Sequence, residues 1–537
     1  MVAVTLNGIK DTEGFKKAGV VLPQYDVAEA QRYSVDHPVW VHAGPGNIFR
    51  GFIASLQQTL LDKGLQKSGI HTVSFQDADI IDKVYKPHDN LTMEVTLLPN
   101  KDVELRVIGS VIGGFATSSD RPEDCAAVRK IFSSKSLQLY SFTITEKGYA
   151  LKGIDGKFFP AVEKDLAAGP ANCTHAMTQT TALLLERYKN GAYPLAVVSM
   201  DNCSHNGDKI KDAVLTIANA WKDNGFVDAG FVEYLTDESK ITFPWTMIDK
   251  ITPRPDPEIV ELLRQRGIVD MDPYKTSFGT FIAPFVNAEK PQYLIIEDKF
   301  PNGRPPLEEA GVLFTDKKGV DLCERMKVTT CLNPLHTALA VYGCVLGYER
   351  ISAEMEDPDL VKLVKTLGYD EGIKVVDDPK ILSPKAFLDE VINERLPNKC
   401  LPDSPQRIAT DTSQKVSIRF GETIKNYKKK GFDTSTLVAL PLAIAGWIRY
   451  LLAIDDNGKP FELSDDPLLP KLKESLASVK FGDPSSVGDN LKPILSNETI
   501  FGVDLYAVGL GNKIEEMVKE MLKGPNAVRS TLQSYLK

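Results

Sequence analysis

Three polar residues with chemically useful side chains lie at the head of one long apolar stretch, which runs from Glu324 to Tyr348. They are Lys327, Asn333 and His336, whose amine, amide and imidazole groups exchange protons or hydrogen bonds. Buried polar groups without partners are costly, so at the edge of a core these three need one another, a ligand or water. The alternative is a capping asparagine, a core histidine and a solvated lysine.

The element that must position them is predicted to be a buried helix over residues 334–347. Asn333 followed by Pro334 predicts an N-cap with proline at the first helical position. Apolar residues then recur near helical spacing, which indicates burial. They are Leu335, Leu339, Val341, Tyr342 and Val345.

A strand, a glycine turn and a helix near the start of the chain predict a phosphate-binding unit of a dinucleotide fold. Residues 39–41 indicate a short buried strand, Gly44 and Gly46 lie in the turn, and residues 53–61 continue as a helix. Glycines let the backbone approach a pyrophosphate, and a helix N-terminus attracts its charge. The match to GxGxxG is incomplete because Phe49 takes the third position, so a simple strand–turn–helix connection is the alternative.

Polar residues follow two further predicted strands. Asp77 and Asp79 come after the strand at residues 71–75, where an acid would hold the ribose hydroxyls or form a turn. The apolar run at residues 195–200 predicts a parallel strand buried on both faces. It leads directly into DNCSHNGDKI, at the strand end where α/β sheets place ligands. The alternative is an Asx turn that caps the helix at residues 209–221.

The pattern along the 537 residues predicts two domains. Residues 1–300 form an α/β Rossmann-like dinucleotide-binding domain, with residues 1–36 as an arm lying on it. Residues 301–537, from the Pro- and Gly-rich segment onward, are dominated by helical periodicity and form a mostly α-helical substrate-binding domain, with a cleft between the two. In detail, residues 92–98 and 103–109 predict an antiparallel pair, residues 243–253 a loop, and residues 307–313 a helix.

Composition narrows the classes of partner and site. The net charge of −9 argues against a nucleic-acid or membrane-surface partner. No signal peptide and no membrane-spanning run is visible. The seven cysteines form no CxxC pair, which suits a reducing cytoplasm and argues against structural zinc. His336 is the only histidine after His205, so a clustered histidine metal site is not expected.

Eight segments, in order from about Val39 to Leu452, resemble the long-chain polyol dehydrogenase family, which contains mannitol 2-dehydrogenase, fructuronate reductase and tagaturonate reductase. The segments are GPGNIFRGF, TITEKGY, DNCSHNG, FPWTMIDKITP, EDKFPNGRP, CLNPLH, RIATDTSQK and WIRYLL. The resemblance implies metal-independent hydride transfer between NAD(P) and a secondary alcohol of an open-chain sugar derivative.

The resemblance also implies residue roles. Lys327 matches the catalytic lysine, a general base if burial or neighbouring cations lower its pKa. Asn202 and Asn333 match two amides that would stabilise a developing alkoxide, and His336 would orient the substrate oxygen or the lysine. Arg407, Lys415 and Asn206 are the expected substrate-binding residues, where the two cations would hold hydroxyls or a carboxylate. The expected cofactor-binding residues are Gly44, Gly46, Asn47, Phe49, Arg50, Asp77 and Glu146.

One departure from the family pattern concerns the lysine. Lys327 lies six residues before Asn333, whereas the spacing in the family is five. One extra helical residue turns the chain by about 100°, which would swing Lys327 out of the site. The sequence therefore predicts a π-turn or a helix break between Val328 and Asn333, which absorbs the extra residue.

Within the family, RIATDTSQK most resembles the uronate reductases, and Arg407 with Lys415 suits a carboxylate. The expected reaction is D-mannonate plus NAD to D-fructuronate plus NADH. Tagaturonate reductase and mannitol 2-dehydrogenase activities stay open, as do NADP and the choice of monomer or homodimer. The alternative from a different class is a nucleotide-binding sensor that kept the fold and lost the chemistry, which the shifted lysine favours.

Overall fold

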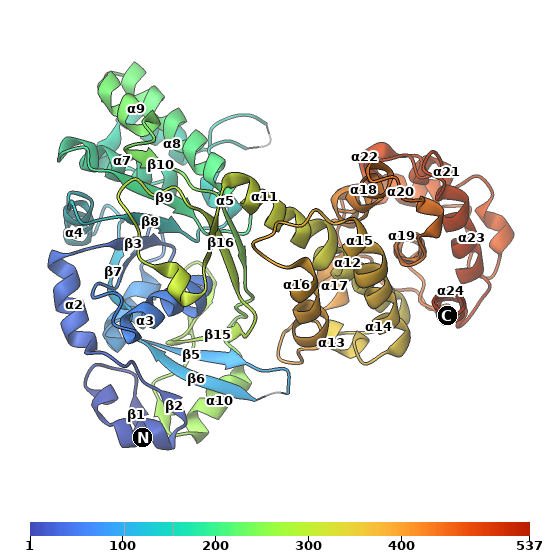
Figure 1. Cartoon of the computed structure of the whole chain (residues 1–537), viewed down its shortest axis with the longest axis horizontal. Coiled ribbons are helices and arrows are strands. Elements are labelled where there is room, and N and C mark those ends of the chain that lie inside the picture. Colours follow the sequence, from blue (N-terminus) through green and yellow to red (C-terminus); the bar gives the residue numbers. More distant parts are fainter. Residues whose placement is uncertain (101, 154) are drawn as a thin grey trace. The chain divides into compact units, whose positions relative to one another are not determined.

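The computed structural model describes residues 1–100, 102–153 and 155–537, and these divide into two compact units (Figure 1). Unit 1 comprises Met1–Leu98 and Asp102–Asp321. The main run of unit 2 extends from Leu322 to Lys537. Each unit is described by itself.

The centre of unit 1 is a six-stranded parallel sheet in the order β10-β9-β8-β3-β4-β7. Its strands are β3 (Trp40–Ala43), β4 (Ile70–Ser74), β7 (Val111–Ala116), β8 (Leu139–Phe142), β9 (Leu195–Ser199) and β10 (Ile241–Thr242). Numbered along the chain, this is the 3-2-1-4-5-6 order of dinucleotide-binding folds, whose ligand site lies where the order reverses. Here that point falls between β3 and β8, and the predicted Rossmann-like fold is confirmed.

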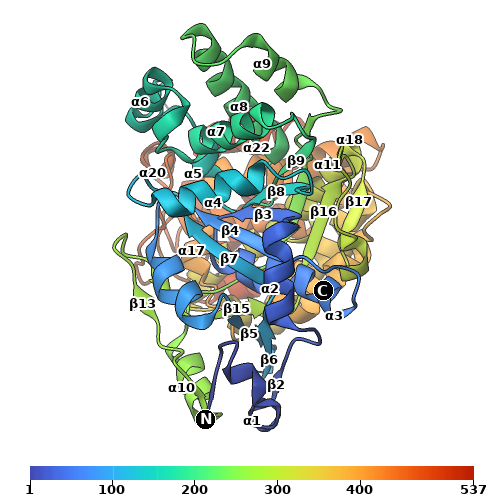
Figure 2. The ribbon, with the colours of Figure 1, turned by 90° about the vertical axis from the view of Figure 1, so that its left-hand side faces the viewer.

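Both faces of this sheet are covered, which explains why its strands are apolar throughout. Figure 2 shows β9, β8, β3, β4 and β7 side by side in this order. One face packs against α4 (Pro122–Phe132), α7 (Ala176–Lys189) and α8 (Asn206–Asp223). The other packs against α3 (Ala54–Asp62), the π-turn η3 (Ile81–Tyr85) and two strands of a separate sheet, β11 (Thr246–Asp249) and β16 (Tyr293–Glu297).

The predicted antiparallel pair is present in a second sheet, as β5 (Thr92–Leu97) and β6 (Val103–Ile108). Lys101, which lies between them in the sequence, is outside the described residues. The first 36 residues are more than an arm. They contain β1 (Val2–Ala3), which pairs with β12 (Ile268–Val269), and β2 (Val20–Val21), which pairs with β6. The first two helices, α1 (Thr12–Lys17) and α2 (Val27–Asp36), connect them to the central sheet.

Two local expectations were wrong. The predicted loop at residues 243–253 contains β11, which pairs antiparallel with β16. The predicted helix at residues 307–313 is a short 3-10 turn, η6 (Leu307–Ala310), followed by β17 (Leu313–Thr315), which pairs with β16. A short apolar run in a sequence fits a strand or a helix equally well. Both of these runs are strands here, because each pairs through its backbone with β16. The pairing also carries unit 1 past residue 300 to Asp321.

Smaller elements complete unit 1. They are η1 (Gly8–Lys10), η4 (Lys86–His88), α5 (Glu146–Tyr149), α6 (Pro160–Ala168), η5 (Pro170–Asn172), α9 (Ala229–Thr236), α10 (Pro257–Gln265), β13 (Tyr274–Lys275), β14 (Phe281–Ile282) and β15 (Phe285–Glu289).

Unit 2 is built around α12 (Asn333–Leu346), which packs against α17 (Pro405–Ala409) and α19 (Ala439–Leu451). Its described residues form helices, turns and isolated bridges, so the mostly helical prediction is confirmed. Gly347 ends α12 in the left-handed region, at φ 80°. Within the described part of the chain, no helix combines the length and apolar character that crossing a bilayer requires.

The remaining elements of unit 2 follow in chain order. They are the rest of α11 (Lys317–Met326), η7 (Lys327–Cys331), α13 (Ile351–Glu354), α14 (Pro358–Lys365), η8 (Thr366–Gly372), α15 (Ile373–Val375), α16 (Pro384–Glu390), η9 (Val391–Arg395), η10 (Thr412–Gln414), η11 (Ser417–Gly421), α18 (Glu422–Lys429), η12 (Thr434–Thr436), α20 (Leu469–Ser475), η13 (Pro484–Val487), α21 (Lys492–Leu495), α22 (Glu498–Phe501), α23 (Gly511–Met521) and α24 (Ala527–Tyr535).

Candidate active site

The glycine turn after β3 has the backbone that a pyrophosphate site requires. Gly44 lies at φ 103°, and a Cβ there would stand 2.2 Å from the carbonyl oxygen of Thr143, so only glycine fits. A Cβ at Gly46 would meet nothing within 4 Å, so the backbone is open there. The helix begins directly after it, since the Arg50 N–H donates to the Gly46 carbonyl at 3.1 Å. These features fit a dinucleotide phosphate at a helix N-terminus.

The side chains that follow this turn stabilise it from inside. Phe49 is fully buried and stacks on His42 with ring centroids 4.3 Å apart. Arg50 is fully buried in the π-turn η2 (Phe49–Ile53) and donates to the Ala283 carbonyl at 2.6 Å and to Asn47 Oδ1 at 2.9 Å. Burial lowers the pKa of Arg50. The side chains of Phe49 and Arg50 are therefore engaged inside the protein, so the cofactor contacts expected of these two residues would come from their backbone atoms.

The two acids after β4, Asp77 and Asp79, differ in how many partners their carboxylate oxygens have. Asp79 pairs with Lys83 at 3.1 Å and accepts the Ser277 N–H at 2.8 Å, and these bonds lower its pKa. Asp77 Oδ1 accepts the Asp79 N–H at 2.9 Å, and its Oδ2 has no hydrogen-bond donor among the described residues. Asp77 is therefore the acid with an oxygen available to a ribose.

A single carboxylate, that of Asp201, ties the ends of β8 and β9 together. It accepts the N–H of Ile144 at 2.8 Å, the N–H of Thr145 at 3.0 Å and the hydroxyl of Tyr149. Thr145 lies at φ 67°, which is unfavourable for a β-branched residue. Asp201 thus holds a strained backbone in the turn that precedes Glu146, and it directly precedes Asn202.

The two asparagines of DNCSHN have different environments. Asn202 is exposed in the turn after β9. Asn206 is fully buried, and its Nδ2 donates to Thr246 Oγ1 at 2.9 Å while its Oδ1 accepts the Thr246 N–H at 3.0 Å. The Asn206 amide is therefore engaged in joining α8 to β11, and the substrate contact expected of it stays a prediction.

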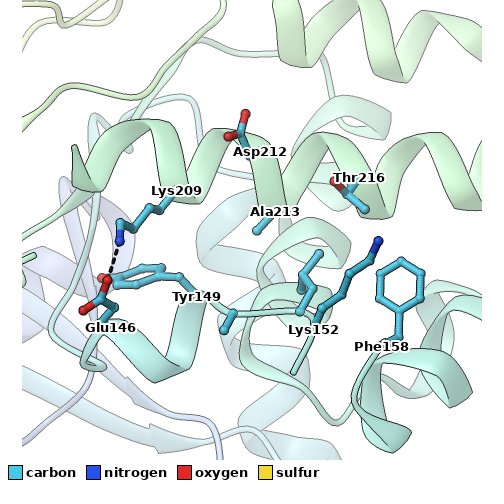
Figure 3. A pocket seen from close by; sticks show the side chains of 10 residues that line it. Glu146, Tyr149, Lys152, Phe158, Lys209, Asp212, Ala213 and Thr216 are labelled. Atoms are coloured by element: carbon cyan, nitrogen blue, oxygen red, sulfur yellow. Dashed lines mark hydrogen bonds and ion pairs between the residues drawn. The ribbon is translucent and has the colours of Figure 1, made fainter. Parts of the chain in front are cut away.

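Glu146 lies at one end of a cavity of about 490 Å³ between α5, the segment after it and α8 (Figure 3). Its carboxylate pairs with Lys209 of α8 and stays 65% exposed. The other end of the cavity holds Lys152, whose amine lies 4.6 Å from the Phe158 ring centroid. A cofactor that contacts Glu146 would therefore bind a carboxylate that is already paired with Lys209.

The predicted π-turn is present at the lysine. The segment η7 (Lys327–Cys331) is a π-helix, closed by the Leu332 N–H that donates to the Lys327 carbonyl at 3.1 Å. Leu332 then leaves helical geometry at φ −127°. The extra residue is thus absorbed between Lys327 and Asn333, as the spacing predicts. Lys327 is 2% exposed, so the solvated alternative is excluded.

Asn333 is not the N-cap that the sequence predicts. The cap position is Leu332, with no side-chain cap hydrogen bond, and α12 begins at Asn333 itself. The reason is the π-turn, which leaves one residue between the two helices and gives it the non-helical backbone. The Asn333 amide forms no hydrogen bond with described residues, and its carbonyl accepts the Thr337 hydroxyl at 2.9 Å. The amide is thus available to a ligand.

His336 follows on the first turn of α12 and is kept neutral. Burial lowers its pKa to about 4, against the attraction of Asp403, and Arg419, Arg407 and Arg395 lower it further. Its Nε2 is buried, has no hydrogen-bond partner in the described part of the chain, and lies 3.6 Å from Asp403 Oδ2. A neutral imidazole with an unsatisfied nitrogen is suited to hydrogen-bond a substrate oxygen.

The two predicted substrate cations are unequal. Arg407 is 62% exposed and pairs with Asp403, so its charge is already compensated. Lys415 donates to the Thr410 carbonyl, and its pKa is lowered by burial and by Arg419.

Sequence reasoning missed two residues, Asp201 and Arg419. Asp201 is the first residue of the DN pair, and only its hydrogen bonds across the sheet edge show that it holds the ends of β8 and β9 together. Arg419 lies four residues after Lys415, the spacing that places two residues on one helix face, which could have pointed to it. Among the described residues, no group of three or more His, Cys, Asp and Glu is placed to hold a metal ion.

Two family models match this chain over most of its length. The model described as the mannitol dehydrogenase Rossmann domain matches residues 39–309, and the mannitol dehydrogenase C-terminal domain matches residues 320–522. The chain belongs to the mannitol dehydrogenase family. The family prediction drawn from the eight segments is thereby confirmed, and the chain is an oxidoreductase.

Individual members of the mannitol dehydrogenase family agree with this assignment. D-mannonate oxidoreductase of Thermotoga maritima is 52% identical over 531 residues, 98% of each chain. The structure of a D-sorbitol dehydrogenase in substrate-free form matches with a TM-score of 0.78 and 26% identity, covering 96% of this chain and 98% of that one. Pseudomonas fluorescens mannitol 2-dehydrogenase, in a ternary complex with NAD and D-mannitol, matches with a TM-score of 0.66 and 25% identity, covering 96% and 97%.

Proposed function

We propose that this chain interconverts D-mannonate and D-fructuronate with NAD as the hydride acceptor. The observation that carries the chemistry is the buried Lys327 on a π-turn, directly before the available amide of Asn333 and the unsatisfied imidazole of His336. The substrate is proposed from the 52% identity to a D-mannonate oxidoreductase. The spacing that favoured an inactive sensor is explained by the π-turn, which supports an enzyme.

The glycine turn and Asp77 would hold NAD. The Gly44–Gly46 backbone and the helix N-terminus suit its pyrophosphate, and Asp77 Oδ2 suits a ribose hydroxyl. NAD, when bound, supplies the hydride acceptor for the carbinol carbon. Glu146 with Lys209 is the further candidate contact, next to the turn that Asp201 holds.

The alcohol proton must leave as the carbon is oxidised, and Lys327 is the proposed general base for it. The Asn333 amide would donate a hydrogen bond to the reacting oxygen and stabilise its developing negative charge, an effect that is typically worth about 10² to 10³ in rate. His336 would orient the same oxygen. The resemblance adds Asn202 of unit 1 as a second amide donor, and that role stays a prediction.

The test is NADH absorbance with a substrate panel. D-mannonate and D-mannitol are offered with NAD and NADP, and D-fructuronate and D-tagaturonate with NADH, to the natural protein and to Lys327→Met. We expect D-mannonate and D-fructuronate to give the highest kcat/KM and Lys327→Met to be inactive with NADH binding retained. NADH binding without turnover of any substrate would overturn the proposal in favour of the sensor.

A further inference from the structure

Arg419 is a half-buried cation without an acidic partner among the described residues. Its guanidinium sits on η11, and burial lowers its pKa to about 10. The only side-chain hydrogen bond that it forms with described residues is donated to the Thr337 hydroxyl. None of the carboxylates in the described part of the chain lies within 4.0 Å of it. A partly desolvated charge that is left unpaired is unfavourable, so this position favours an anion that the described residues do not supply.

The neighbouring charges do not compensate it. Asp403 is engaged by Arg407 and faces His336. Lys415 adds a second positive charge, and its own acidic neighbours are Asp411 and Asp466. Arg419 and Lys415 therefore make a pair of neighbouring positive charges, while Arg407, the arginine that the family motif highlights, is exposed and neutralised.

This pair of cations adjoins the start of α12, which carries Asn333 and His336. The Thr337 hydroxyl that Arg419 contacts donates in turn to the carbonyl of Asn333. The π-turn η11 packs against both η7, which carries Lys327, and α12. The Arg419 charge is also felt by His336, whose pKa it lowers. The unpaired guanidinium thus lies beside the residues proposed to handle the reacting hydroxyl, all within unit 2.

We propose that Arg419 binds the carboxylate of the sugar-acid substrate and sets the preference for an acid over a neutral polyol. A guanidinium offers a planar fork that matches the two carboxylate oxygens, so an acid would neutralise the half-buried charge and satisfy its donors. A terminal hydroxymethyl group would leave that charge unpaired. This inference rests on the proposed function, because it assigns one end of the same substrate.

The test compares D-mannonate with D-mannitol, which has the same reacting hydroxyl and a hydroxymethyl group in place of the carboxylate. We expect Arg419→Gln to lower kcat/KM for D-mannonate by about 100-fold, mainly through KM, because truncating one partner of a buried charged pair has effects of this order. D-mannitol should change by less than about 5-fold, since it makes no charged pair there. Arg419→Lys, which keeps the charge and loses the fork, should fall between. Arg350→Gln, an exposed arginine of unit 2, is the matched control and should match the natural protein.

Each outcome has a defined meaning. An unchanged mannonate-to-mannitol ratio in Arg419→Gln overturns the inference, as does an equal loss with both substrates, which indicates a structural role. If Arg419→Gln does not fold, Arg419→Lys decides by the same ratio. If the natural protein oxidises another sugar acid instead, the ratio is measured with that acid. A natural protein that turns over neither class, or that prefers D-mannitol, refutes the proposed function. A natural protein that prefers D-mannonate and keeps that preference in Arg419→Gln refutes this inference alone.

Discussion

Replacing Asp201 with asparagine should loosen the edge of the sheet from which Asn202 projects. The natural carboxylate accepts three hydrogen bonds, two from the N–H groups of Ile144 and Thr145 and one from the Tyr149 hydroxyl. Asparagine keeps one accepting oxygen and turns an NH₂ group toward the donors that the other oxygen served. At least one donor is then left facing another donor.

The expected change in the free energy of unfolding for Asp201→Asn follows from opposing effects. A buried donor without a partner costs about 1 to 3 kcal/mol, and hydrogen bonds to a charged acceptor are about twice as strong as neutral ones. The strained Thr145, at φ 67°, then has less to hold it, and such strain is worth about 1 to 3 kcal/mol. Against this, burial raises the pKa of Asp201, so removing the charge recovers part of its desolvation cost. The net expected loss is about 1 to 3 kcal/mol in the free energy of unfolding.

The assays are urea unfolding and steady-state kinetics with D-mannonate. Besides the loss of stability, Asp201→Asn should lower kcat/KM by about 10- to 100-fold, because a displacement of about 1 Å at a reacting group has effects of this order. Asp212→Asn is the matched control, since Asp212 is exposed and its carboxylate accepts no hydrogen bond from described residues. An Asp201→Asn protein with natural stability and kinetics would refute the reasoning.

Three further predictions follow from the site. Lys327→Met should lower the oxidation rate by about 10²- to 10⁴-fold and leave NADH affinity unchanged, because it removes the proposed proton acceptor; a near-natural rate would make Lys327 structural. Asp77→Ala should weaken NADH binding by about 10-fold in a fluorescence titration, as expected for one lost charged hydrogen bond, and an unchanged affinity would remove Asp77 from the site. Burial lowers the pKa of His42 to about 3 and of His71 and His336 to about 4, so below pH about 6.5 the unfolded chain binds protons that the folded chain does not. The free energy of unfolding should therefore decrease as the pH is lowered from 6.5 to 4, by up to about 1.4 kcal/mol per pH unit for each histidine. A urea midpoint that stays constant from pH 7 to 5 would contradict this.

Local features of the sequence were enough to predict much of the fold. The apolar run of β9 indicates a strand buried on both faces, and the glycine turn after β3 requires a residue without a Cβ. The helix α12 follows from its apolar spacing and ends at a glycine with φ 80°. Even the π-turn at Lys327 was predictable, because one residue too many between two positions that are expected to share a site must be absorbed within a few residues of chain.

The tertiary structure decided which polar groups are engaged and which are available. The sequence presents Asn333 as a cap, Asn206 as a ligand contact and Arg407 as the substrate arginine. Among the described residues, the structure leaves the amide of Asn333 without a partner, engages Asn206 with Thr246, and pairs Arg407 with Asp403, while no carboxylate lies within 4.0 Å of Arg419. Short-range spacing sets helices, strands and turns because their hydrogen bonds are local. The partner of a buried charge or amide comes from far along the chain, and only the packed structure determines which one it meets.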